Sequence, residues 1–107
     1  MTQTTHELKT VNPWFSDIWD GKKNFEVRKD DRGFKVGDIL RLREFEPNAL
    51  HGDNEEYLIL LSGNPYSGRE IRCIVEYILP AGSLPDLKYC VMGIYVTSRK
   101  TITLKGE

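Results

Sequence analysis

Three charged residues near the start of the chain have the types and spacing of a small polar site. Lys23, Glu26 and Arg28 stand in a run whose centre alternates between apolar and charged residues. This alternation is typical of a β-strand that turns Phe25 and Val27 toward the core and its charged residues toward solvent. Side chains two residues apart on one strand face stand roughly 7 Å apart, so one ligand or one water could bridge Glu26 and Arg28.

These three groups are suited to binding or to acid/base chemistry. The ammonium and the guanidinium can donate to a phosphate or to a base carbonyl, and the carboxylate can accept from an exocyclic amine. Lys23 and Glu26 could also act as an acid/base pair. The alternative is an ordinary solvated strand face, since exposed ion pairs contribute only about 0–1 kcal/mol to stability.

Basic residues gather in the same part of the chain. The net charge is −1 over 107 residues. Residues 22–43 contain eight Lys/Arg and four Asp/Glu, so this segment carries +4 and the remainder −5. A local basic patch on an acidic body suits an anionic ligand, although chance clustering would give the same pattern.

A short helix is expected just before this site. Asn12 and Pro13 are a typical helix start, with Asn as the N-cap and Pro at the first helical position, and Gly21 is the expected stop. Four apolar residues fall on one side of the helix, and both tryptophans are expected in the core: Trp14, Phe15, Ile18 and Trp19. A helix this short is marginal alone, so a sheet must hold it.

Alternating or apolar runs separated by turn residues predict the strands. We expect a weak strand over His6–Val11 and clearer ones over Asn24–Lys29, Ile39–Phe45, Tyr57–Leu61, Ile71–Leu79 and Tyr89–Val96, the last broken at Gly93. Turns and loops are expected at residues 30–38, 48–56, 62–68 and 80–88. Without a βαβ rhythm, this pattern predicts a mainly β (α+β) fold, a small antiparallel or mixed barrel of five to six strands with a short N-terminal helix.

Length and composition indicate one small domain over residues 1–107, with residues 1–5 and 98–107 expected to be flexible. Cys73 and Cys90 lie in apolar runs and are expected to be buried. No metal site or cofactor is predicted, because a third ligand and the relevant motifs are missing. No apolar run is long enough to span a bilayer, so we expect a cytoplasmic protein without a membrane partner.

The charged run also carries a family resemblance. The sequence GKKNFEVRK, followed by FKVGDIL, resembles the ASCH domain of the PUA-like superfamily. Together with HELKT and YSGREIRCIVEYIL, it is similar to a bacterial and phage family of unknown function with an ASCH-like fold. The resemblance covers residues 6–46 and 66–96, and residues 48–65 are expected to form an inserted hairpin or loop.

The resemblance implies a PUA-like β-barrel with a cleft lined by the lysine and the polar strand face, and binding of RNA or of modified nucleosides. One enzymatic branch deacylates acetylated cytidine through a lysine, a threonine and a glutamate. The lysine carries over as Lys23 and the strand arginine as Arg28, but Glu26 occupies the threonine position. Neither Glu70 nor Glu76 can be matched to the later glutamate.

The leading interpretation is a non-catalytic module that binds RNA or a modified nucleotide or nucleoside in a small basic cleft. The alternatives are a small amidohydrolase using Lys23 and Glu26, and a protein-interaction module using the long loop. The predicted ligand-binding residues are Lys22, Lys23, Glu26, Arg28, Lys29, Arg32, Arg41, Arg43, His6 and Tyr89.

Some of these residues depend on how the strands are arranged. Arg41 and Arg43 contribute only if their strand neighbours the 24–29 strand. His6 contributes only if the first strand does, and is otherwise expected to be exposed. Tyr89 could stack on a base at the mouth of the cleft, and the alternative is a half-buried aromatic of a strand or loop. The oligomeric state is left open.

Overall fold

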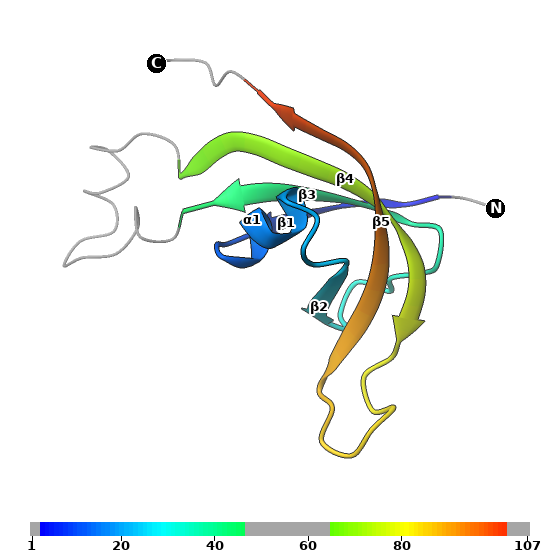
Figure 1. The fold of residues 1–107 in the computed structure, drawn as a ribbon. Coiled ribbons are helices and arrows are strands. Elements are labelled where there is room, and N and C mark those ends of the chain that lie inside the picture. The colour runs from blue at the N-terminus through cyan, green and yellow to red at the C-terminus, as the bar shows by residue number, and fades with distance from the viewer. Residues whose placement is uncertain (1–2, 47–64, 103–107) are drawn as a thin grey trace.

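The structure is a computed structural model that describes residues 3–46 and 65–102. In this part of the chain, five strands form one curled half-barrel sheet with a single short helix (Figure 1). The elements in chain order are β1 (Thr5–Thr10), α1 (Trp14–Trp19), β2 (Phe25–Lys29), β3 (Ile39–Phe45), β4 (Tyr66–Leu79) and β5 (Tyr89–Thr101). The predicted mainly β fold with a short N-terminal helix is confirmed. The expected strand Tyr57–Leu61 lies outside the described residues, as does the 48–65 segment except its last residue.

The order of strands across the sheet is β1-β3-β4-β5-β2. β1 pairs with β3 in parallel, and the other three pairs are antiparallel. β1 and β2 are therefore the two edge strands, and no ladder joins them. The curl nevertheless brings them together, because an arginine of β2 reaches the backbone of β1. We call the region between these two edge strands the seam.

The core lies on the inner face of the curled sheet. β3 contributes Leu40 and Leu42, which alternate with charged residues as the sequence predicts. Helix α1 packs Phe15 and Ile18 against the same cluster, and both are fully buried. Cys73 and Cys90 are buried in it as predicted. No helix in the described part of the chain is long and apolar enough to cross a membrane.

The ends of α1 follow the sequence signals closely. The Asn12 side chain accepts hydrogen bonds from the backbone N–H and the hydroxyl of Ser16, but the predicted start is wrong by one residue, because Pro13 is the N-cap and the helix begins at Trp14. At the other end Gly21 has a φ of +83°, the Gly21 N–H donates to the Ile18 carbonyl, and the Lys22 N–H donates to that of Asp17. This double hydrogen bond is a Schellman motif, which requires a residue with positive φ. It sets the direction in which the chain leaves the helix toward β2.

Several expected boundaries are wrong. β4 begins at Tyr66, inside the expected 62–68 turn, and β5 runs unbroken through Gly93 to Thr101, inside the tail expected to be flexible. Thr5 likewise belongs to β1, because pairing with β3 orders it. β4 and β5 pair with each other along most of their length. This pairing extends both strands beyond the apolar runs from which they were predicted. Gly93 accommodates an irregularity in that ladder between Val75 and Tyr77.

Candidate functional site

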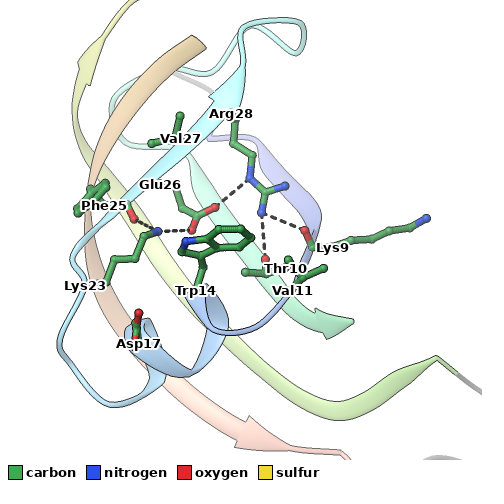
Figure 2. Close-up of a pocket in the computed structure, with 10 residues that line it drawn as sticks. All are labelled: Lys9, Thr10, Val11, Trp14, Asp17, Lys23, Phe25, Glu26, Val27 and Arg28. Carbon is green, nitrogen blue, oxygen red and sulfur yellow. Dashed lines mark hydrogen bonds and ion pairs between the residues drawn. The ribbon is translucent and has the colours of Figure 1, made fainter. Parts of the chain in front are cut away.

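A pocket of about 690 Å³ opens at the seam (Figure 2). The end of β1 and the loop after it supply one wall, α1 supplies another, and β2 with the residue before Asn24 supplies the third. The lining residues are Lys9, Thr10, Val11, Trp14, Asp17, Lys23, Phe25, Glu26, Val27 and Arg28. Three elements that are distant in the sequence thus meet around one hollow, which we call the seam pocket.

The two faces of β2 are the reverse of the prediction. Phe25 and Val27 are 41% and 46% exposed, whereas Glu26 is only 3% exposed and points inward. Register places Glu26 opposite the buried Met92 of β5, on the inner face of the sheet. A carboxylate can occupy this position because cations satisfy it there, which alternation of residue types along the strand does not reveal.

Glu26 lies between the two cations that the sequence placed beside it. Lys23 Nζ donates to Glu26 Oε2 over 3.1 Å, and Arg28 Nε donates to Glu26 Oε1 over 2.9 Å. The side chains of Lys23, Glu26 and Arg28 are 13%, 4% and 24% exposed. We call these three residues the triad. Its members are not the solvent-facing charges expected from the sequence, because they form a largely buried ion cluster with one excess positive charge.

Two further contacts hold the ammonium group of Lys23. Lys23 Nζ also donates to the Phe25 carbonyl over 2.6 Å and lies 4.7 Å from the centre of its ring. The Schellman end of α1 places Lys23 there, since the Lys23 N–H donates to the same Asp17 carbonyl as its neighbour. The turn after the helix is thus the element that delivers the lysine into the pocket.

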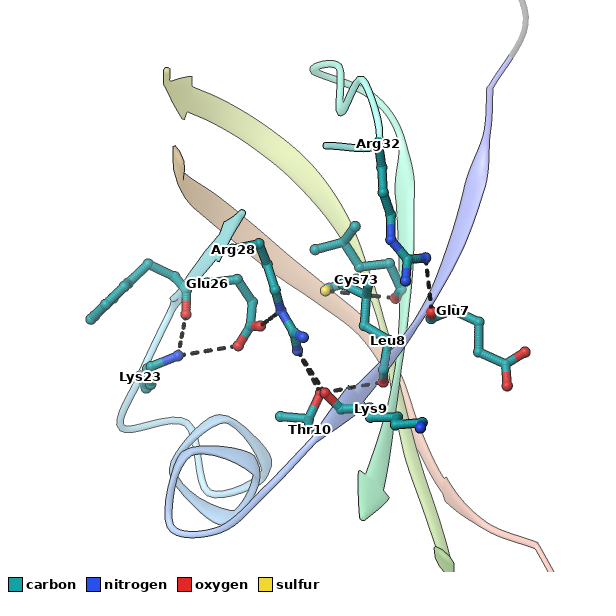
Figure 3. Close-up of polar contacts among 11 residues, drawn as sticks. Glu7, Leu8, Lys9, Thr10, Lys23, Glu26, Arg28, Arg32 and Cys73 are labelled. Carbon is teal, nitrogen blue, oxygen red and sulfur yellow. Dashed lines mark hydrogen bonds and ion pairs between the residues drawn. The ribbon is translucent and has the colours of Figure 1, made fainter. Parts of the chain in front are cut away.

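Arg28 and Arg32 span the seam (Figure 3). Arg28 Nη2 donates to the Lys9 carbonyl and to Thr10 Oγ1, both over 3.0 Å. Arg32 Nη1 donates to the Glu7 carbonyl over 3.2 Å. Guanidinium groups therefore provide the contacts between the two edge strands where a ladder is missing.

Trp14 is the main residue of the pocket that the sequence interpretation missed. It was expected in the core with Trp19, but it is 52% exposed and lines the pocket together with Glu26 (Figure 2). Phe15 and Ile18 fill the core instead, and Trp19 packs partly buried against it. The helical period alone does not reveal this, because Trp14 is four residues from the buried Ile18, and residues i and i+4 share a face as i and i+3 do.

The remaining basic residues predicted for the cleft are dispersed. Lys22, Lys29 and Tyr89 are exposed and do not line the seam pocket. Arg41 and Arg43 lie on β3, which pairs with β1 and β4 and not with β2. Both form ion pairs with Glu7 on the outer face, and Arg41 also pairs with Glu70. Arg41 and Arg43 were expected in the cleft only if their strand neighboured the 24–29 strand, and it does not. Arg32 and Arg43 instead meet in a second pocket, described below.

His6 is neither in the seam pocket nor exposed. It is 8% exposed, its ring contacts Phe34, and its Nε2 lies 2.8 Å from Asp38 Oδ2. Asp38 also accepts hydrogen bonds from the backbone of Thr4 and Lys35. Despite the cost of its burial, these bonds lower the pKa of Asp38 below its usual range. The pair connects the start of β1 to the turn before β3, so its position indicates a structural role.

The described residues give no sign of thiol or metal chemistry near the triad. Burial, with the nearby Glu26 carboxylate as a second cause, raises the pKa of Cys73 to about 12. A thiol with such a pKa is not a nucleophile at neutral pH. Within the described ranges, no three His, Cys, Asp or Glu side chains gather in a way that could hold a metal ion.

Two comparisons relate the chain to known sequences. The family model described as "Domain of unknown function (DUF3850)" matches residues 5–94. A protein of Escherichia phage P2, described as "Uncharacterized 12.9 kDa protein in GpA 3'region", is 36% identical over 56 residues, which are 52% of this chain and 51% of that relative. The match therefore spans about half the length of the phage protein. Neither description names a ligand or a reaction.

Proposed function

Since this chain belongs to the DUF3850 family, a domain of unknown function, we propose a function from its seam pocket: it is a non-catalytic module that binds a base of RNA or of a modified nucleotide. One observation carries the proposal. An exposed indole, that of Trp14, lines the same pocket as a buried cluster of two cations and a carboxylate. A base presents a flat face and a polar edge, and this pocket offers a partner for each.

The face of the base would stack on Trp14. Stacking of a base on an aromatic side chain contributes about 1–3 kcal/mol and tolerates any base, because every base has a π face. Trp14 is available for this role, since about half of its surface is exposed and it lines the pocket. Val11 lines the same pocket and adds apolar surface beside the indole.

The triad would bind the polar edge. Lys23 has three N–H donors, and its bonds in the described residues go to the Phe25 carbonyl and to Glu26. Arg28 donates through Nε to Glu26 and through Nη2 to β1. Within the described residues its Nη1 has no acceptor, so Nη1 can donate to a carbonyl or a ring nitrogen of the base. Each Glu26 oxygen has a second lone pair that can accept from an exocyclic amine. The site thus combines donors and an acceptor, as a base edge requires.

The same geometry favours binding over hydrolysis of an acylated nucleoside. Both Glu26 oxygens already accept from cations, which compensate the negative charge of the carboxylate. A carboxylate attacking an amide would form a reactive anhydride, unlike the ester formed by a hydroxyl. We therefore expect the purified protein to show no appreciable deacylation of acetylated cytidine. Robust turnover that disappears in Glu26→Gln would establish the hydrolase alternative instead.

The resemblance to the ASCH domain supports the proposal from the sequence. It includes the lysine, the strand acid and the arginine, which are the three members of the triad. We therefore also propose that this family is related to the PUA-like superfamily. The alternative of a protein-interaction module uses the 48–65 segment, which lies almost wholly outside the described residues.

Tryptophan fluorescence provides the test. Ribonucleosides and a mixed-sequence single-stranded oligoribonucleotide are titrated into the protein, and binding is read from quenching and from calorimetry. We expect saturable binding that Trp14→Ala weakens about tenfold or more, as loss of one stacked base predicts. Tyr95→Ala is the matched control, because Tyr95 is 60% exposed on the outer face of β5. Equal affinity of the wild type and Trp14→Ala, or no binding at low salt, would reject the proposal.

A further inference from the structure

A second pocket of about 450 Å³ lies at the seam on the far side of Arg28. Its lining residues are Glu7, Leu8, Lys9, Arg28, Arg32, Arg43 and Tyr66, and we call it the arginine pocket. Resting on the function proposed above, we propose that the arginine pocket is a phosphate subsite. The ligand is then a phosphorylated nucleoside, with its base in the seam pocket and its phosphate among the arginines.

The charges of the arginine pocket favour an anion. Four of its residues are cationic, and Glu7 is its one acid. Glu7 is already neutralised, because its two oxygens accept from Arg41 and Arg43 over 2.9 and 2.8 Å. Within the described residues, Lys9 and Arg32 form no ion pair with any carboxylate. Two exposed cations therefore border this pocket without a counter-charge.

The guanidinium groups also retain donors of the right geometry. Arg32 uses Nη1 toward the Glu7 carbonyl, and its Nε and Nη2 are not engaged in the described part of the chain. Arg28 Nη1 is likewise available, and Arg43 uses Nη1 toward Glu7 while its guanidinium lies 3.8 Å from the Tyr66 ring centre. Planar guanidinium forks bind phosphate oxygens through paired N–H donors. The hydrogen bonds that close the seam thus orient the arginines and leave some of their N–H groups available to a ligand.

The two pockets adjoin, because Lys9 and Arg28 line both. Arg28 donates to the Glu26 carboxylate in the seam pocket and to the carbonyl of Lys9, the other residue that lines both pockets. A ligand whose base is held by Trp14 and the triad therefore has its continuation directed past Arg28 to the arginines. This adjacency is the reason for assigning a phosphate of the same ligand, and not an unrelated anion.

The test compares ribonucleosides with their 5′- and 3′-monophosphates by calorimetry on the full chain. We expect at least one monophosphate to bind about tenfold or more tightly than its nucleoside, as a charge-assisted contact to phosphate predicts. Arg32→Gln should remove most of that gain, measured as the ratio of monophosphate to nucleoside affinity of the same variant. Lys29→Gln is the matched control, since it removes the same charge from an exposed residue outside both pockets. Arg43→Gln is the second variant.

The outcomes separate the two proposals. If nucleosides and monophosphates bind the wild type equally, the arginine pocket is not a phosphate subsite, while the base site stands. If the gain is real but Arg32→Gln, Arg43→Gln and Lys29→Gln reduce it alike, the effect is general charge attraction and the subsite is rejected. If neither nucleosides nor monophosphates bind, both proposals fail.

Discussion

At the scale of residues, the site depends on a carboxylate that the sequence appeared to place in solvent. Glu26 is enclosed by Lys23 and Arg28, and all three are mostly buried. Removing one partner from a buried ion cluster is costly, because the remaining charges lose their compensation without regaining full hydration. The triad is therefore part of the fold as well as the proposed binding site.

Replacement of Glu26 should show this directly. We expect Glu26→Ala to lower the free energy of unfolding by about 2–4 kcal/mol, somewhat below the value for fully buried pairs because Lys23 and Arg28 keep some contact with water. Urea denaturation measures the loss. Glu76→Ala is the control, since Glu76 is exposed on β4 and its loss should change stability by no more than about 0.5 kcal/mol. Similar small effects for both variants would mean that the triad is not a structural cluster.

At the scale of elements, the turn after α1 positions Lys23. Gly21 takes a φ of +83°, and a Cβ there would meet no atom within 4 Å. Substitution is therefore opposed by the backbone conformation alone, which a residue with a Cβ adopts at a cost of about 1 kcal/mol. Gly82 has a similar φ of +87° and the same open surroundings, but it lies in the loop between β4 and β5.

These two glycines allow stability and site geometry to be separated. We expect Gly21→Ala and Gly82→Ala to lower the free energy of unfolding by a similar amount, about 1 kcal/mol each. Only Gly21→Ala should also weaken base binding, because the Schellman turn directs Lys23 toward Glu26. Denaturation and calorimetry on the two variants measure both effects. Unchanged binding in Gly21→Ala would mean that the turn does not control the triad.

A second buried carboxylate joins α1 to the sheet and should govern acid stability. Hydrogen bonds from Arg69, and with them Ser67 and Asn12, lower the pKa of Glu44 from 4.5 to about 2. The guanidinium of Arg69 also lies over the rings of Phe15 and Trp19 in α1. Because the folded protein holds this proton less tightly than the unfolded chain, the stabilisation is complete above about pH 4.5 and is lost as the pH falls toward 2.

Urea titrations between pH 7 and pH 2 test this expectation. The wild type should lose roughly 3 kcal/mol through Glu44 as the pH falls through that window. Glu44→Gln should be less stable than the wild type at pH 7 and should lose less on acidification. The other carboxylates with lowered pKa values, including Asp38 and Glu70, contribute equally to both curves. Parallel acid profiles for the two proteins would contradict the assignment to Glu44.

The sequence predicted where the elements lie in the chain better than it predicted which strands are neighbours in the sheet. Turn residues and alternation located α1, β2 and β3 within one or two residues, and Gly21 was found as the helix stop. Which strands pair is decided by tertiary packing, so the dispersal of Arg41 and Arg43 away from the seam pocket could not be read from spacing. The inversion of β2 had another cause: Lys23 and Arg28 stand beside Glu26 in the sequence, but the alternation of residue types does not show that their charges allow the carboxylate to turn inward.

At the scale of the whole molecule, positive charge is concentrated in a small patch and does not form one large basic surface. The net charge is −1, yet four cationic residues surround the arginine pocket. If the protein binds RNA as we propose, the number of phosphates that it contacts at once should therefore be small. This agrees with the limited basic segment seen in the sequence, although its members divide between two pockets and the outer face.

Salt dependence of RNA binding measures that number. For a short single-stranded oligoribonucleotide we expect log K to fall with log salt at a slope of about −2 to −3, corresponding to three or four phosphate contacts at roughly −0.7 each. Arg32→Gln should reduce the magnitude by about 0.7, whereas Lys29→Gln should leave it nearly unchanged. A slope near −6, which would indicate about eight or more contacts, would require a long groove that this charge distribution does not provide.

The closure of the seam has a further consequence for how this molecule meets others. A free edge strand presents unpaired carbonyl and amide groups on which a strand from another chain can add, a common route to aggregation. On β1 the carbonyls of Glu7 and Lys9 already accept from Arg32 and Arg28. Long cationic side chains thus cover the edge where a backbone would otherwise dock. The same two arginines that we assign to phosphate recognition should also hinder strands of other molecules from pairing with the open edge of this sheet.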